Sequence, residues 1–274
     1  MDLNTVQAVI PADRAAIDGW ERGDAWLGGG TWLFSEPQPE LRRLIDLQAF
    51  NWSPLTATTG GVEIAATCTL AELVGWAQSA GASVWPATRL IPQCCRALLG
   101  SFKVWNAATV GGNLCLALSA GPMISLVVAL DGVCTIWEAG GEVRTVPAAD
   151  FVLGPGETTL TPGALLRSVL LPASALRCAT AFRQLSLSPL GRSGVVVIGR
   201  AAPFGGEVAI TLTASVPRPV RLHFAAPPTT EQVQQAFDAA DLDYYDDPHG
   251  DPEWREHLSR MYAEEVRSEL EANG

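Results

Sequence analysis

The sequence predicts an α+β fold, and three observations carry that prediction. Short strand-like runs alternate with short helices up to residue 172, the stretch 179–224 reads as consecutive strands, and two helices close the chain. With 274 residues, of which 48% are hydrophobic, the chain is long enough to form one or two domains with a buried core.

Before residue 172 the pattern predicts a series of short elements. Thr69 and Glu72 have the spacing of a capping box, which marks a helix start. The pair Gly140-Gly141 indicates a hairpin turn between two strands. The elements expected are helices at 12–23, 69–79 and 87–99, and strands at 25–28, 44–47, 62–67, 134–138, 142–146 and 165–171.

After residue 172 the composition becomes strand-rich and then helical. Asp251 followed by Pro252 is typical of a helix N-cap with proline at the first helical position. The expected elements are strands at 179–184, 195–200, 207–214 and 220–224, and helices at 230–240 and 252–271.

Charge is unevenly distributed along the chain. The net charge is -11, and residues 229–274 carry 13 acidic residues against 3 arginines, whereas the preceding residues carry 16 acids and 15 bases. Neither part has the clustered cations that nucleic-acid binding needs. No run of about 18–20 apolar residues predicts membrane insertion, and the N-terminus lacks a signal-peptide pattern. We therefore expect a cytoplasmic protein.

The residue types that usually bind metals or act in catalysis form no clear site. The six cysteines include no CxxC pair, so we expect buried or incidental thiols. An acidic cluster with two histidines is better explained by helix capping and dipole effects than by metal binding. That cluster comprises Asp246, Asp247, His249, Asp251, Glu253 and His257. We predict neither a catalytic side chain nor a metal site.

Two glycine-rich turns, at 28–31 and 109–113, are the candidate binding elements. Glycine permits positive φ, so successive backbone N–H groups can converge on an anion. Two such turns could together hold the pyrophosphate of a dinucleotide, although each alone is also compatible with a simple tight turn. Neither fits the GxGxxG or P-loop pattern.

The order of these motifs resembles the FAD-binding (medium, flavoprotein) subunits of the molybdenum hydroxylases, the xanthine dehydrogenase and carbon monoxide dehydrogenase family. GGGTWL at 28–33 is similar to the family's AGGTDL, and WNAATVGGN at 105–113 is similar to RNxATIGGN. LIDL at 44–47, VALDG at 128–132 and TPG at 161–163 follow at the family's spacing. DPHG at 247–250, with Trp254 and Arg255, resembles the end of the carbon monoxide dehydrogenase type.

The resemblance implies a two-lobed FAD-binding domain of the PCMH/vanillyl-alcohol-oxidase type over residues 1–172, with lobes at about 1–56 and 57–172. A smaller C-terminal α+β domain would cover 173–274. In the family the backbone of both glycine motifs holds the FAD pyrophosphate. The implied cofactor-binding residues are Gly28, Gly29, Gly30, Thr31, Trp32, Asn106, Thr109, Gly111, Gly112 and Asn113.

The implied function is that of an oxidoreductase subunit that transfers electrons. Electrons would pass from [2Fe-2S] clusters of a small partner subunit through FAD to NAD or another acceptor. A large partner subunit would hold the molybdenum cofactor, so FAD would be the only cofactor of this chain.

The chain departs from the family pattern at four positions. Trp32, Trp105 and Pro122 stand where the family typically has Asp, Arg and Asp, and Gln184 replaces a lysine. The two tryptophans could pack against a ring of FAD or within the core. Two alternatives therefore remain open, an FAD-free scaffold subunit of such a complex and a stand-alone PCMH-type flavin oxidase.

Overall fold

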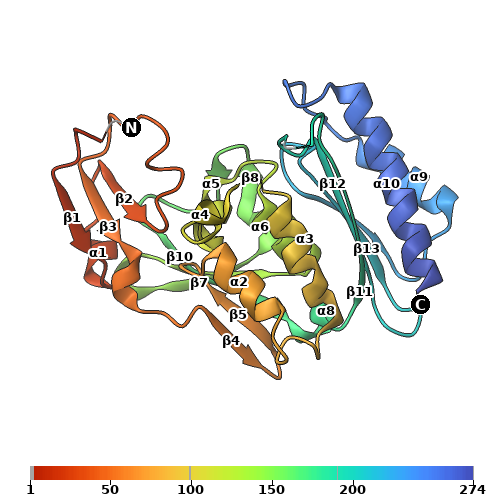
Figure 1. The fold of residues 1–274 in the computed structure, drawn as a ribbon, viewed down its shortest axis with the longest axis horizontal. Helices are drawn as coiled ribbons and strands as arrows, with labels where there is room; N and C mark the ends of the chain where they lie inside the picture. The colour runs from red at the N-terminus through yellow and green to blue at the C-terminus, as the bar shows by residue number, and fades with distance from the viewer. Residues whose placement is uncertain (1–2, 99, 190, 274) are drawn as a thin grey trace.

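The computed structural model describes residues 3–98, 100–189 and 191–273. The described chain contains three principal β-sheets, which follow one another in sequence and lie side by side along the long axis of the molecule (Figure 1). The N-terminal sheet lies at one end, and the C-terminal sheet with its covering helices lies at the other.

The first sheet is parallel, with the strand order β1-β3-β2. Its strands are β1 (Ala8–Pro11), β2 (Asp24–Leu27) and β3 (Arg43–Asp46). The helix predicted at 12–23 was wrong, because α1 spans only Ala15–Asp18. It ends where the amide of Gly19 donates to Ala15 O, and the chain then turns into β2.

The second sheet is antiparallel, with the order β4-β5-β10-β6-β7. Gly140 and Gly141, which join β6 to β7, both have positive φ, as the predicted hairpin requires. Strand β4 was not predicted. The strands are β4 (Leu55–Thr58), β5 (Gly61–Ala65), β6 (Val133–Trp137), β7 (Val143–Pro147) and β10 (Leu165–Pro172).

Five α-helices lie between residues 70 and 129 of the described chain, and they pack with this sheet around the largest core. The capping box at Thr69 and Glu72 is confirmed at the start of α2 (Leu70–Ala77). The helix predicted at 87–99 begins as a 3₁₀ helix, η2 (Pro86–Arg89), and continues as α3 (Leu90–Arg96), while residue 99 lies outside the described residues. The other three are α4 (Phe102–Trp105), α5 (Val110–Leu116) and α6 (Pro122–Ala129).

Short elements complete this part of the chain. They are η1 (Leu47–Phe50), η3 (Ala139–Gly141), α7 (Ala148–Phe151), β8 (Val152–Gly154), β9 (Glu157–Thr158) and α8 (Ala173–Leu176). The domain division at residue 172, where β10 ends, stays a prediction.

The third sheet is an antiparallel meander, and its four predicted strands are confirmed. They are β11 (Ala179–Leu185), β12 (Val195–Ala201), β13 (Val208–Thr213) and β14 (Val220–Phe224). The predicted terminal helices are α9 (Thr230–Ala240) and α10 (Pro252–Ala272). Helix α10 covers one face of the sheet (Figure 1).

Helix α6 packs against the third sheet as well as the second. All eight of its residues are buried, and Ser125 shares a 2.6 Å hydrogen bond with Thr213 of β13. A helix that is apolar on every side is expected at such a shared position. The charge-free composition of residues 114–130 therefore reflects burial between two sheets.

The buried guanidinium of Arg255 organises the start of α10. It donates to three backbone carbonyls, those of Gly194, Ala214 and Gly250, and pairs with Asp247 at 2.5 Å. Asp251 caps the helix by accepting from the amide of Trp254, as predicted. Asp247 and Asp251 thus have structural partners, and no three His, Cys, Asp or Glu residues in the described chain are placed to hold a metal.

Asp131, just after α6, links the second and third sheets. Its carboxylate pairs with Arg200 of β12, which is 4% exposed, and with Arg221 of β14. We expect Asp131→Asn to lower the free energy of unfolding by about 2 kcal/mol, because it leaves the buried guanidinium of Arg200 with only the exposed carboxylate of Glu207, at 3.5 Å, as a counter-charge. Urea denaturation would measure this. Asp238→Asn, which breaks an exposed pair with Arg260, should cost less than about 1 kcal/mol, and equal losses would contradict the role of Asp131.

Candidate functional site

The structure brings the two glycine segments into direct contact. A Cβ on Gly28 would lie 3.0 Å from Oγ1 of Thr109, and one on Gly29 would overlap the carbonyl oxygen of Ala107. Only glycine allows two backbones to approach this closely. The segments are about 80 residues apart in sequence, and their contact creates one continuous backbone surface.

The first segment presents free backbone donors. Gly30 has a φ of 69°, and the chain then forms a turn in which the amide of Phe34 donates to Gly30 O at 2.9 Å. The amides of residues 29–33 have no acceptor within the described part of the chain. Consecutive unpartnered N–H groups of this kind form an anion-binding surface.

The amides of the second segment, in contrast, are already bonded within the protein. The amide of Val110 donates to Cys68 O at 2.8 Å and that of Gly111 to Ala66 O at 2.9 Å. The amide of Gly112 donates to Oγ1 of Thr109 at 3.1 Å. These backbone groups therefore hold α5 in place instead of facing an open site.

The expectation of a positive-φ turn at 109–113 was wrong. Thr109 is the N-cap of α5, and Gly111 and Gly112 lie in its first turn without positive φ. Gly111 is required for a different reason, because a Cβ there would lie 2.5 Å from the Cβ of Ala66. The glycine pair thus allows the helix to pack tightly on the chain that follows β5.

Side chains of the second segment remain available for binding. Oδ1 of Asn113 accepts from the amide of Met123 at 2.9 Å, and its Nδ2 has no partner among the described residues. Thr109 accepts from Gly112, which leaves its hydroxyl hydrogen free to donate. Asn106 is exposed. Pro122 occupies the first position of α6, where its missing N–H has no cost.

The two tryptophans beside the glycine segments have different environments. Trp32 is 44% exposed. Trp105 is half-buried, and its Nε1 is buried without a hydrogen-bond partner in the described chain. Trp105 lines a cavity of about 270 Å³ together with Arg96, Ala97, Leu98, Gly100, Gln184, Pro189 and Gly191.

This cavity adds residues that the sequence motifs did not identify. Gln184, on β11, donates from Nε2 to Oγ of Ser193 at 2.8 Å, and Leu98 and Gly100 precede α4. The cavity thus lies between the glycine-motif part of the chain and the third sheet. Of its lining residues, the sequence had indicated Trp105 and Gln184, both as departures from the family pattern.

The thiols of this region are unsuited to nucleophilic or metal chemistry. Burial, with the nearby Glu72 carboxylate and Cys95, raises the pKa of Cys68 to about 12. Burial also raises the pKa of Cys95 to about 12. Both are protonated at neutral pH, and both are buried, as predicted. Five of the six cysteines are buried and Cys115 is exposed.

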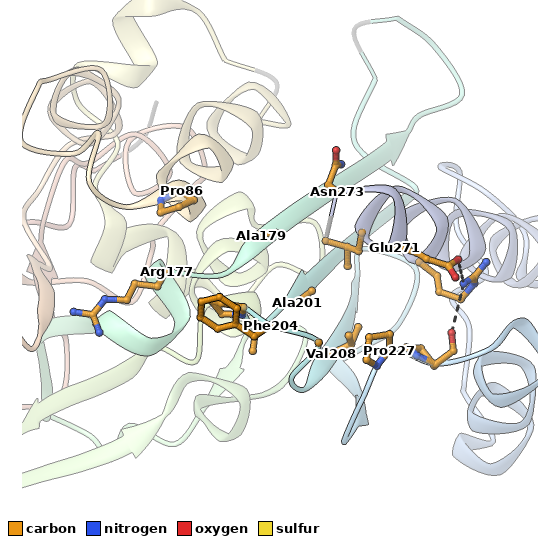
Figure 2. Close-up of a pocket in the computed structure, with 15 residues that line it drawn as sticks. Pro86, Arg177, Ala179, Ala201, Phe204, Val208, Pro227, Glu271 and Asn273 are labelled. Carbon is orange, nitrogen blue, oxygen red and sulfur yellow. Dashed lines mark hydrogen bonds and ion pairs between the residues drawn. The ribbon is translucent and has the colours of Figure 1, made fainter.

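A second cavity, of about 460 Å³, is shown in Figure 2, and no residue of the glycine segments is among its lining residues. It is bordered by β11, by the hairpin between β12 and β13, and by the end of α10. Its walls are mainly apolar and include Pro86, Ala179, Val208 and Leu270.

Comparison with known sequences identifies the family of the chain. Residues 20–174 match the family described as "FAD binding domain in molybdopterin dehydrogenase". The chain belongs to this family. The match includes both glycine segments and the cavity-lining residues from Arg96 to Trp105. FAD is accordingly the cofactor of the family to which this chain belongs.

Curated proteins that are similar in sequence to this chain include plant xanthine dehydrogenases. The enzyme of Oryza sativa subsp. japonica is 36% identical over 84 residues, which cover 28% of this chain and 6% of the relative. Xanthine dehydrogenase 1 of Arabidopsis thaliana is 32% identical over 84 residues, with the same coverage. The match thus spans a small part of these much longer proteins.

Solved structures confirm the fold over the whole chain. Reconstituted CO dehydrogenase from Oligotropha carboxidovorans gives a TM-score of 0.84 at 19% identity, with 100% of both chains covered. Carbon monoxide dehydrogenase from Hydrogenophaga pseudoflava gives 0.83 at 22% identity and 99% coverage of both. Quinoline 2-oxidoreductase from Pseudomonas putida 86 gives 0.80 at 20% identity and 98% coverage of both.

None of the helices in residues 3–98, 100–189 and 191–273 is both long enough and apolar enough to cross a lipid bilayer.

Proposed function

We propose that this chain is the FAD-binding, electron-transferring subunit of a molybdenum hydroxylase-type complex. The observation that carries the proposal is the junction of the two glycine segments, where the amides of residues 29–33 lack acceptors in the described chain. This junction lies within the part of the chain that belongs to the FAD-binding family.

The residues at the junction fit the FAD pyrophosphate. Backbone amides of Gly29, Gly30, Thr31 and Trp32 would donate to the phosphate oxygens, as in other anion-binding backbone nests. No lysine is needed, which suits a chain whose single lysine is Lys103.

The second segment would contribute side chains and close packing. The hydroxyl of Thr109 and Nδ2 of Asn113 are the available donors there, and Asn106 adds an exposed carboxamide. The remaining predicted residues are Gly28, Gly111 and Gly112. Gly28 would allow the first segment to approach Thr109, and Gly111 would allow α5 to approach Ala66. The amide of Gly112 would fix the hydroxyl of Thr109.

The cavity beside Trp105 is the proposed location of the flavin ring. Trp105 is two residues from Ala107, which contacts Gly29, and two residues span at most about 7 Å. A ring system attached to a pyrophosphate at Gly29 can reach this cavity. The unpartnered Nε1–H of Trp105 and the carboxamide of Gln184 are polar groups suited to a heterocycle.

FAD supplies the redox chemistry in such a subunit, and the protein binds it, orients it and limits solvent access. The described residues at the junction include no acid, base or nucleophile pair, which suits electron relay better than substrate chemistry. We infer that partner subunits hold [2Fe-2S] clusters and a molybdopterin cofactor, and that NAD or another acceptor takes the electrons.

The test is a titration of the purified chain with FAD, followed by absorbance and flavin fluorescence. We expect one FAD per chain, a flavin spectrum, and release of FAD on denaturation. A folded chain that stays colourless and takes up no FAD would contradict the proposal and favour an FAD-free scaffold. Bleaching of the isolated holo-chain by a substrate would favour a stand-alone flavin oxidase instead.

A further inference from the structure

Phe204 combines two unfavourable features at one position. It lies in the hairpin between β12 and β13, and its side chain is fully exposed at 106% relative accessibility. Its φ is 61°, a conformation that bulky residues adopt only at a cost. Glycine would avoid both costs, and it occupies the next position, where Gly205 has a φ of 69°. An exposed aromatic ring held this way is typical of a functional contact.

An apolar groove lies directly beside this ring. Figure 2 shows Phe204 among the residues that line the 460 Å³ cavity, between Arg177 and Ala201. The groove floor consists of small and aliphatic side chains, among them Ala179, Ala201, Val208 and Leu270. The volume is in the range that holds a drug-sized ligand or several buried side-chain groups.

The two ends of the groove carry opposite accessible charges. Arg177 extends at one end and Glu271 lies at the other, with Phe204 between them (Figure 2). Arg177 is exposed and has no ion-pair partner among the described residues. The carboxylate of Glu271 is 66% exposed, whereas Arg267, with which it pairs, is only 14% exposed.

We propose that this face is the interface of a two-fold symmetric dimer of the chain, in which Phe204 of each copy enters the groove of the other. With a two-fold axis beside Phe204, the grooves of the two copies run in opposite directions. Arg177 of each copy then meets Glu271 of the other copy. Such a surface is self-complementary, as an isologous interface must be.

The acidity of the C-terminal segment does not oppose this arrangement. The charged residues lining the groove are two arginines, Arg177 and Arg267, and one glutamate, Glu271. Most of the acidic residues of the segment therefore lie outside the contact. The groove is also separate from the glycine junction, so the dimer does not depend on the proposed FAD function.

The mass of the isolated full-length chain in solution tests the proposal, measured by light scattering and sedimentation over about 1–200 µM. We expect a concentration-dependent dimer and, for Phe204→Gly, at least about a hundredfold weaker association, because both copies lose an apolar anchor. Phe204→Gly also relieves the positive φ, so its melting temperature should equal or exceed that of the wild type. Phe102→Ser, which removes another exposed ring, is the matched control and should leave association unchanged.

A charge exchange tests the symmetry. Arg177→Glu and Glu271→Arg should each weaken the dimer, and the double variant should recover most of the loss because the pairs re-form across the axis. A wild-type chain that is monomeric throughout the range, or a dimer unaffected by Phe204→Gly, would overturn the proposal. So would a monomeric chain whose association with a partner subunit is lost in Phe204→Gly, since that result assigns the face to a different protein.

Discussion

Gly29→Ala is expected to lower the free energy of unfolding by at least about 3 kcal/mol and to abolish FAD binding. The added Cβ would overlap the carbonyl oxygen of Ala107, which is backbone and cannot move aside as a flexible side chain can. The two glycine segments would have to separate, and the amides of residues 29–33 would lose their position. Urea denaturation and titration with FAD measure the two effects.

Gly75→Ala is the matched control for this substitution. Gly75 lies in α2 with no atom within 4 Å of the position that a Cβ would occupy. Alanine in an exposed helix interior should stabilise the protein by about 0.5–1 kcal/mol and leave FAD affinity unchanged. If Gly29→Ala folded and bound FAD as the control does, close contact of the two segments would not be what builds the site.

Arg255→Met is expected to cost about 3–5 kcal/mol, because it removes the charged partner of Asp247 and leaves three buried carbonyls without their donor. Arg255 is among the largest fully buried side chains of the protein. Arg260→Met is the control, since Arg260 pairs with Asp238 and Glu256 at the surface and should matter by about 1 kcal/mol or less. Equal losses in urea denaturation would contradict the central role of Arg255.

Arg255→Met should also reduce the loss of unfolding free energy that the protein undergoes as the pH falls. Burial alone would raise the pKa of Asp247, but the amide of His249 and the guanidinium of Arg255 outweigh burial and lower it. A carboxyl group with a lowered folded-state pKa stabilises the protein above its unfolded pKa of about 3.9, and that stability is lost as the pH falls. Between about pH 5 and 3 the wild type should therefore lose more stability than Arg255→Met.

Short sequence motifs correctly predicted the helix ends that depend only on neighbouring residues. The capping box at Thr69 and Glu72 and the Asp251 cap were correct because each depends on residues three positions apart. The helix predicted at 12–23 is shorter because the amide of Ala12 donates to Asp46 O, which extends the pairing of β1 with β3, and because Gly19 ends α1 after Asp18. That pairing with β3 is a long-range contact, which periodicity does not report.

The binding site was predictable only in part for the same reason. The sequence located both glycine segments, but it could not reveal that Ala66 and Cys68 accept from the amides of Gly111 and Val110. Those acceptors follow β5, more than 40 residues earlier in the chain. Similarly, the position of Gln184 beside Trp105 depends on how the third sheet docks, and no local pattern encodes it.

The burial of α6 between two sheets limits how this protein can be divided. The largest core contains Val196 and Ile198 of β12 together with residues of α6, so the two halves of the sequence share one interior. A gene fragment ending at residue 172 would encode a helix whose apolar surface faces water, and we expect it to aggregate. Truncation, fusion and domain exchange in this chain should therefore treat residues from β11 onward as inseparable from the FAD-binding part.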